Sequence, residues 1–319
     1  MNRTNRNNVN HNPWYIQVLS FFGSALAGGF FISFLAILDL LESGWINMLL
    51  GLVGILTTSY LSFTLKTETR ESRDPIMLSF FLQSYAIFLL GLDDVLDPSF
   101  TTFLSINILL QFVFYFIFLN SLNKFFVIIN GFISLLFLLN EFHLYLIYPY
   151  LGGILALFVV YFSKSENQIQ DDPYLFYSIV NCFLGLYLFP HILSLQIKTE
   201  IYLSYFLLLP AIYYLSIELF PKLTREKAFL ILALVFVLFL PLVEAPGILA
   251  SSILIIIGLN KKSFFLTNLA RIALIGYFCT LYYQMETTLL YKSYFMLGSG
   301  SLFVLTYLGW NIYDKQNQS

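Results

Sequence analysis

The chain of 319 residues is 59% hydrophobic and 19% aromatic. Only 11% of its residues are charged, against about 25% in an ordinary soluble domain, and the formal net charge of −2 argues against a nucleic-acid partner. This composition excludes a soluble domain and predicts an all-α, polytopic helix bundle in a lipid bilayer.

Twelve apolar runs predict about twelve transmembrane helices between residues 13 and 311. Residues 1–12, rich in Asn, are expected to be a disordered cytoplasmic tail, and residues 312–319 a second one. The first run continues beyond Ala27, so it is predicted to be an uncleaved helix and not a signal peptide. The predicted runs are 14–38, 45–65, 76–92, 101–119, 125–139, 144–162, 174–193, 201–220, 228–243, 247–259, 264–283 and 288–310.

A polar linker at 163–173 separates six runs from six. This spacing suggests two halves, 13–162 and 174–311, and no soluble domain is inserted between any two runs. No residue-level repeat relates the halves, so an internal duplication is left open.

Bases and acids occupy alternate gaps between the runs, with Lys198 and Lys292 as exceptions. Because bases concentrate in cytoplasmic loops, this alternation predicts that both termini lie in the cytoplasm. The basic gaps hold Arg3, Arg6, Lys66, Arg70, Arg73, Lys124, Lys164, Lys222, Arg225, Lys227, Lys261, Lys262 and Lys315. The acidic gaps lie around Leu40, Asp94, Glu141, Glu244 and Glu286.

Two runs are short for a bilayer about 30 Å thick. Runs 228–243 and 247–259 would reach only about 24 and 20 Å, and the turn of Glu244, Ala245, Pro246 and Gly247 joins them. Short segments interrupted by Pro or Gly can mark a transporter binding site. The alternative is a hairpin that is buried among longer helices.

Ionisable residues inside apolar runs are costly, which makes them candidates for function. Lys292 lies near the outer end of the last run, where bases are avoided, so we expect a partner: Glu244 by preference, or Glu286. The alternative is a lysine that extends to the outer headgroups. Arg271 is expected to extend to the cytoplasmic interface in the same way.

Other candidates carry weaker signals. Asp93, Asp94 and Asp97 could bind a cation, although solvated helix ends explain them better because no EF-hand spacing is present. No metal site, cofactor motif or catalytic constellation is recognisable, which leaves enzyme activity uncertain and disfavoured. Small residues in the first run, such as Gly23 and Gly28, predict close helix packing, inside the chain rather than in a dimer.

Several motifs resemble those of a known family. They are Pro13-Trp14-Tyr15, the turn from Glu244 to Gly247, Tyr282-Tyr283, and the stretch from Thr288 to Ser293. Together they resemble a family of bacterial membrane proteins, the domain of unknown function numbered four-four-zero-one, best over residues 224–310. The resemblance implies a multi-pass inner-membrane protein, often encoded near a small exported protein with a GDYxxLxxxx motif, and implies no established activity.

Two classes of function follow. The first is a scaffold or assembly partner that holds an exported protein at the outer face. The alternative is a secondary transporter or exporter with its site near 228–259, and an enzyme that acts on a lipid or on the cell wall comes third. A transporter needs polar residues at the middle of the membrane. The runs between residues 45 and 139 are expected to contribute few of them.

Overall fold

The computed structural model describes residues 14–64, 70–117, 121–164, 173–192, 198–219 and 246–284, with a few positions between 290 and 301. All regular structure in these ranges is α-helical, as the composition predicts, because a backbone in lipid must satisfy its own hydrogen bonds. The predicted tails, most of the linker 163–173 and the short run 228–243 lie outside the described residues, as does most of the last run.

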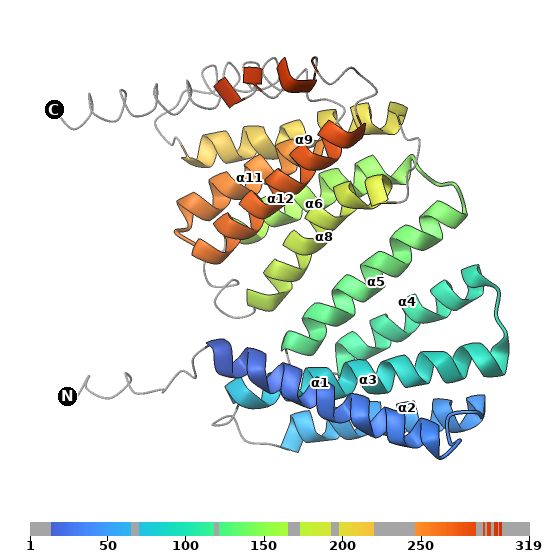
Figure 1. Ribbon diagram of the computed structural model, residues 1–319. Helices are drawn as coiled ribbons and strands as arrows, with labels where there is room; N and C mark the ends of the chain where they lie inside the picture. The colour runs from blue at the N-terminus through green and yellow to red at the C-terminus, as the bar shows by residue number, and fades with distance from the viewer. Residues whose placement is uncertain are drawn as a thin grey trace, which may run out of the picture. The chain divides into compact units, whose positions relative to one another are not determined.

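Ten helices occupy the described ranges, and each coincides with one predicted apolar run (Figure 1). They are α1 Trp14–Ile37, α2 Gly44–Thr64, α3 Arg70–Leu96, α4 Phe100–Ile117, α5 Ser121–Glu141, α6 Ile147–Lys164, α8 Pro173–Ile192, α9 Lys198–Leu219, α11 Pro246–Asn260 and α12 Phe264–Gln284. Six of these helices, α1 to α5 and α12, are long and apolar enough to cross a membrane; the other four have shorter apolar stretches. The fold is that of a membrane protein.

The chain forms two compact units, Met1–Phe189 and Pro190–Ser319, which are described separately. In the first unit, successive helices from α1 to α5 run in alternate directions, so α1, α3 and α5 finish at the same end (Figure 1). We call this the acidic end; its carboxylates are Asp39, Glu42, Asp93, Asp94, Asp97 and Glu141. The opposite end, where α1, α3 and α5 begin, is the basic end and includes Arg70, Arg73 and Lys124.

Left-handed residues terminate the helices at the acidic end. Asp39 and His143 have φ values of 52° and 55° and follow α1 and α5. After each, a backbone N–H reaches back five residues, from Leu40 to Leu35 and from Leu144 to Leu139, as in a Schellman motif. Asp97 takes the same conformation, at φ 40°, after α3. The chain thus turns sharply at each of these loops.

Glycines bring α2 and α3 into direct backbone contact. A Cβ added to Gly91 would lie 2.3 Å from the backbone N of Met48, and one on Gly51 would lie 2.4 Å from the backbone N of Phe88. Gly28 of α1 likewise fits against the Gln83 amide of α3, which confirms internal packing for this glycine, whereas Gly23 has open space beside it. The Gln83 Nε2 also donates to the Ala25 carbonyl at 3.1 Å.

In the second unit, α11 is buried over most of its surface, and its exposed hydrophobic side chains, Ile256 and Leu259, lie on one face. Ten of its 15 residues are buried, and Gly258 lies so close to α12 that a Cβ there would meet the backbone N of Thr267 at 2.9 Å. A helix that is apolar on all sides belongs in a protein interior. For the run 247–259, this burial agrees with the prediction of a hairpin packed among other helices.

Candidate functional site

Five polar side chains from α3, α4 and α5 meet inside the first unit. We call them the polar cluster; its members are Tyr85, Asn107, Gln111, Asn130 and Ser134. All except Asn130 are buried, and the exposed fraction of Gln111 is 4%. Tyr85 is held by aromatic contacts with Phe81 and Phe114, so the packing of the core fixes the position of its hydroxyl group.

The hydroxyl of Tyr85 is the hub of the cluster. It donates to Asn107 Oδ1 and accepts from Gln111 Nε2 at 2.6 Å and from Asn130 Nδ2 at 3.4 Å. Asn107 Nδ2 donates to Ser134 Oγ at 2.8 Å, and Ser134 Oγ donates to the backbone carbonyl of Asn130 at 2.9 Å. One continuous network therefore links three helices.

The residues of the polar cluster lie near the middle of three candidate membrane spans. Tyr85 is central in Asp74–Leu96, Asn107 and Gln111 lie in the middle of Phe100–Ile117, and Asn130 and Ser134 in the middle of Leu122–Glu141. Hydrogen bonds between helices at this depth contribute on average about 0.6 kcal/mol each to bundle stability. The cluster thus orients α3, α4 and α5 relative to one another.

One acceptor in the polar cluster is unused. The carbonyl oxygen Gln111 Oε1 is buried and makes no hydrogen bond. Such an atom is costly in an apolar environment, and a donor group would relieve that cost. The cluster contains no carboxylate and no base, so it can bind a neutral hydrogen-bond donor such as water more readily than it can carry charge.

The expectation of little polarity between residues 45 and 139 was wrong. Asn107 and Gln111 are four residues apart on α4, and Asn130 and Ser134 are four apart on α5, so each pair shares one helix face. That spacing is visible in the sequence and is the signal that could have found the cluster. The contribution of Tyr85 could not be read in the same way, because it depends on which helix packs beside α4.

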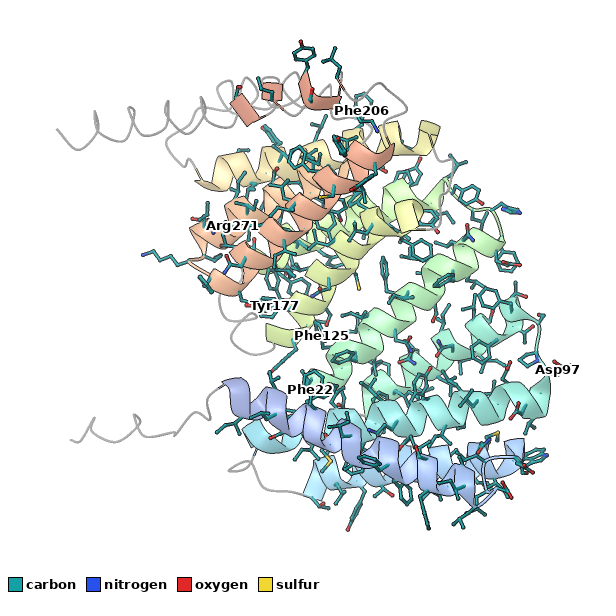
Figure 2. All side chains as sticks on the ribbon, in the orientation of Figure 1. Phe22, Asp97, Phe125, Tyr177, Phe206 and Arg271 are labelled. Atoms are coloured by element: carbon teal, nitrogen blue, oxygen red, sulfur yellow. The ribbon has the colours of Figure 1, made fainter. Side chains whose placement is uncertain are left out.

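The predicted cation candidates lie together at the acidic end. Asp93, Asp94 and Asp97 are all exposed, and the Asp97 N–H donates to the Asp93 carbonyl at 2.9 Å. Asp97 lies beyond the last turn of α3 (Figure 2). Across the described ranges, no three His, Cys, Asp or Glu side chains form a group that could hold a metal ion. Cation binding by these aspartates stays a prediction.

Of the predicted turn from Glu244 to Gly247, the structure describes Pro246 and Gly247, which begin α11. Both are buried, and a Cβ on Gly247 would meet the Tyr277 ring of α12 at 2.3 Å. The glycine is therefore needed for the close packing of α11 against α12. Its predicted link with a binding site is not tested by this contact.

Lys292 is half-buried, and its ammonium nitrogen lies 5.2 Å from the centre of the Tyr282 ring. This cation–π contact gives the base a partner within the second unit. Glu244 and Glu286 lie outside the described residues, so the ion pair with Lys292 stays a prediction. The neighbouring Ser293 is exposed, and its hydroxyl donates to the Leu290 carbonyl at 2.7 Å.

Arg271 is exposed on α12 (Figure 2). Its Nη1 lies 3.5 Å from Asn268 Oδ1, one turn earlier on the same helix, toward the start of α12. This direction is the one expected for an arginine that extends to the interface near Phe264. The structure brings Arg271 into contact with none of the other predicted site residues that it describes.

Comparison with known proteins gives one match. Residues 13–311 match the family described as Domain of unknown function (DUF4401). The chain belongs to this family. The DUF4401 match covers nearly the whole chain, whereas the sequence motifs predicted the strongest resemblance in the final third. The apolar helices in the middle contain few distinctive motifs by which the family could be recognised. No curated protein and no solved structure matches the chain.

Proposed function

We propose that this DUF4401 protein crosses the bacterial inner membrane twelve times and keeps both termini in the cytoplasm. The proposal is supported by ten described helices that match predicted runs and by the absence of Lys and Arg from one end of the first unit, while Arg70, Arg73 and Lys124 lie at the other. Reporter fusions test it. Cytoplasmic signals are expected at Arg70, Gln168 and Arg225, and external signals at Asp94, Glu141 and Thr287.

The protein acts as a scaffold that holds an exported protein at its outer face. The observation that carries this function is the acidic end: its six carboxylates are all exposed, and within the described residues none of them makes an ion pair. The segments that form this end contain no Lys or Arg. No basic side chain among the described residues pairs with them, so they are open to a basic segment of a partner.

The partner is a small exported protein with a GDYxxLxxxx motif, and its capture can be tested directly. A photo-reactive amino acid at exposed Asp97 is expected to cross-link this protein in native membranes, and mass spectrometry would identify it. The same group at Tyr60, which is exposed on α2 toward the basic end, is the control and should capture lipid only.

Removing the charges of the acidic end tests whether its carboxylates attract the partner electrostatically or only lie near it. The triple variant with Asn at positions 93, 94 and 97 is expected to lower co-purification of the partner severalfold, with a larger loss at low salt. Replacing Glu68 and Glu71 by Gln, at the basic end, should have no such effect. Equal recovery of the exported protein with both variants would refute the scaffold proposal.

The polar cluster favours a second function, secondary transport. A polar network at mid-membrane with an unused acceptor is the kind of feature that a transporter uses to bind its substrate. Purified protein in liposomes would distinguish the two functions, because transport needs no exported partner. Loss of uptake in the variant Gln111→Leu, with partner capture intact, would support transport.

A further inference from the structure

An exposed face of α12 carries one charged side chain on an otherwise apolar surface. Phe264, Asn268, Arg271 and Ile275 follow one another at spacings of four, three and four residues, so they share one face of the helix. Phe264 and Ile275 are 82% and 64% exposed, and Arg271 is exposed between them. All four belong to the candidate membrane span Phe264–Tyr283. We call this surface the Arg271 face; it presents a guanidinium group to lipid.

The guanidinium group lies nearer to the start of α12 than the Cα atom of Arg271 does. Its Nη1 is 3.5 Å from Asn268 Oδ1, and Asn268 is only four residues, or about 6 Å, from the first residue of the helix. A long basic side chain on a membrane helix extends toward the headgroups in this way, because its charge is costly in hydrocarbon. The charge of Arg271 is thus directed to the depth at which lipid phosphates lie.

Most of the hydrogen-bonding capacity of Arg271 is unused. A guanidinium group has five N–H donors, and among the described residues Arg271 has the one long contact with Asn268 and no carboxylate partner. The segment 246–284, which forms α11 and α12, contains no Asp or Glu. An arginine binds phosphate through two parallel N–H···O bonds, which makes a phosphate group a suitable partner here.

Lys262 supplies a second cation at the same end of the hairpin of α11 and α12. It is exposed and lies two residues before α12, in a turn where its φ is 52°. The turn is fixed on both sides: the Ser263 N–H donates to the Gly258 carbonyl at 2.9 Å, and Ser263 Oγ accepts from the Leu266 N–H at 3.3 Å. The backbone therefore holds Lys262 at the end of α12 toward which Arg271 extends.

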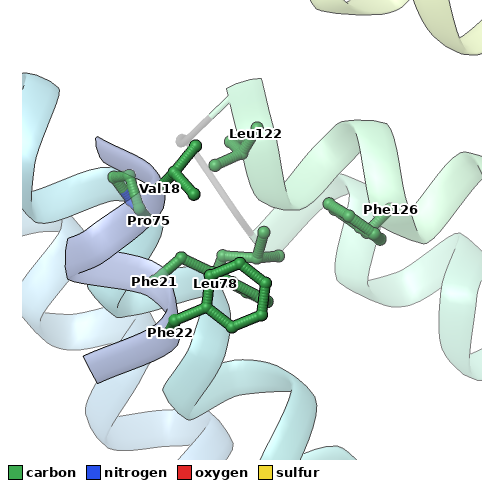
Figure 3. A pocket seen from close by; sticks show the side chains of 7 residues that line it. All are labelled: Val18, Phe21, Phe22, Pro75, Leu78, Leu122 and Phe126. Atoms are coloured by element: carbon green, nitrogen blue, oxygen red, sulfur yellow. The ribbon is translucent and has the colours of Figure 1, made fainter. Parts of the chain in front are cut away.

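The first unit has an apolar groove that shows the contrast (Figure 3). Its volume is about 410 Å³, and side chains such as Val18, Phe22 and Leu122 line it. None of the described residues that line it is polar or charged. Acyl chains can lie in this groove, but none of its lining side chains distinguishes one headgroup from another. The Arg271 face differs because two cations lie at one end of an apolar surface.

We infer that the Arg271 face binds an anionic phospholipid. Arg271 binds the phosphate, Lys262 lies beside the rest of the headgroup, and an acyl chain runs along the helix past Ile275. A zwitterionic headgroup would bring its own cation close to Lys262, so an anionic headgroup is preferred. This inference goes beyond the scaffold and transport roles and depends on neither.

Lipid competition tests the inference. Purified full-length protein in detergent is incubated with phosphatidylglycerol or phosphatidylcholine of identical chains, and native mass spectrometry measures the bound lipid. Preferential binding of phosphatidylglycerol is expected. Arg271→Gln should weaken that binding about fivefold, the change expected for one basic residue near a lipid headgroup. Arg271→Lys, which keeps the charge but loses the paired hydrogen bonds, should give a smaller loss.

Two further variants assign the roles of the cations. Lys262→Gln should lower the preference for phosphatidylglycerol and leave binding of phosphatidylcholine unchanged. Lys124→Gln is the matched control, because it removes one positive charge from α5 in the first unit, where the ammonium group contacts the Tyr115 ring. It should leave the binding of both lipids unchanged. Inorganic phosphate, added at the concentration of the lipid, should not displace phosphatidylglycerol.

Four results would overturn the inference. Equal affinity for the two lipids would leave only ordinary annular contact, and an equal loss of binding in Lys124→Gln and Arg271→Gln would show a general effect of charge. Displacement of the lipid by inorganic phosphate would identify a soluble anion as the ligand. A cross-link from Ile275→Cys to a second copy, or to another segment of the chain, would show that protein covers this face.

Discussion

The contact between α2 and α3 predicts that a single methyl group at Gly91 destabilises the protein. In the variant Gly91→Ala, the added Cβ would lie 2.3 Å from the backbone N of Met48 and 2.6 Å from the Gly44 carbonyl oxygen. Both neighbours are backbone atoms and cannot rotate away. The helices must therefore separate by about an ångström before the contact is relieved, and overpacking of this kind costs about 1–3 kcal/mol.

The variant Gly29→Ala is the matched control. Nothing lies within 4 Å of the position that its Cβ would take, and it is also inside a helix. Each change brings the same gain in helix propensity, so this term cancels between the two variants. The difference in their free energies of unfolding should equal the packing cost alone, about 1–3 kcal/mol with Gly91→Ala the less stable.

The assay is reversible unfolding in mixed micelles, followed by circular dichroism as the fraction of denaturing detergent rises. Cysteine pairs across α2 and α3 would show in addition whether the helices move apart. If Gly91→Ala unfolds at the same detergent fraction as Gly29→Ala, then α2 and α3 are not in backbone contact, and the packing argument for this hairpin is wrong.

Three further predictions concern stability. Asn107→Leu and Gln111→Leu should each lower the free energy of unfolding by about 0.6–1.7 kcal/mol, and the double variant by less than the sum, because both side chains belong to one network. Lys262, which follows α11, has a φ of 52°. Its replacement by Gly should raise the protein's free energy of unfolding by about 1 kcal/mol, as measured by thermal unfolding. Lys292→Met and Glu244→Gln should each lower the yield in detergent while the double variant recovers much of the loss; strictly additive effects would show that the two residues do not interact.

The helices could be predicted from the sequence because the bilayer imposes one rule on every segment. An apolar run must become a helix, and all ten runs that fall in the described residues do so. The lengths were less predictable: α3 begins at Arg70 and ends at Leu96, beyond both limits of the run 76–92, since polar residues extend its ends. Hydropathy measures the apolar part of a helix and not the whole of it.

Pairing between helices could not be predicted, and the polar cluster depends on it. The sequence contains the pairs on α4 and α5, but the hub is Tyr85, which reaches Asn107 and Gln111 only because α3 packs against the two helices. The role of Gly247 was also hidden, because its neighbour Tyr277 is thirty residues later. The exposure of the two free cysteines could not be predicted either, because it also depends on helix pairing. Both lie in apolar runs, yet Cys182 is buried and Cys279 is exposed.

The burial of α11 has a consequence for how the protein responds to bilayer thickness. With 15 residues, α11 is about 22 Å long, shorter than a hydrocarbon core of about 30 Å. Most of its surface is buried in the protein, so its length need not match the lipid closely. The 24-residue α1 is about 36 Å long and largely exposed, so a thinner membrane would tilt α1 and leave α11 in place.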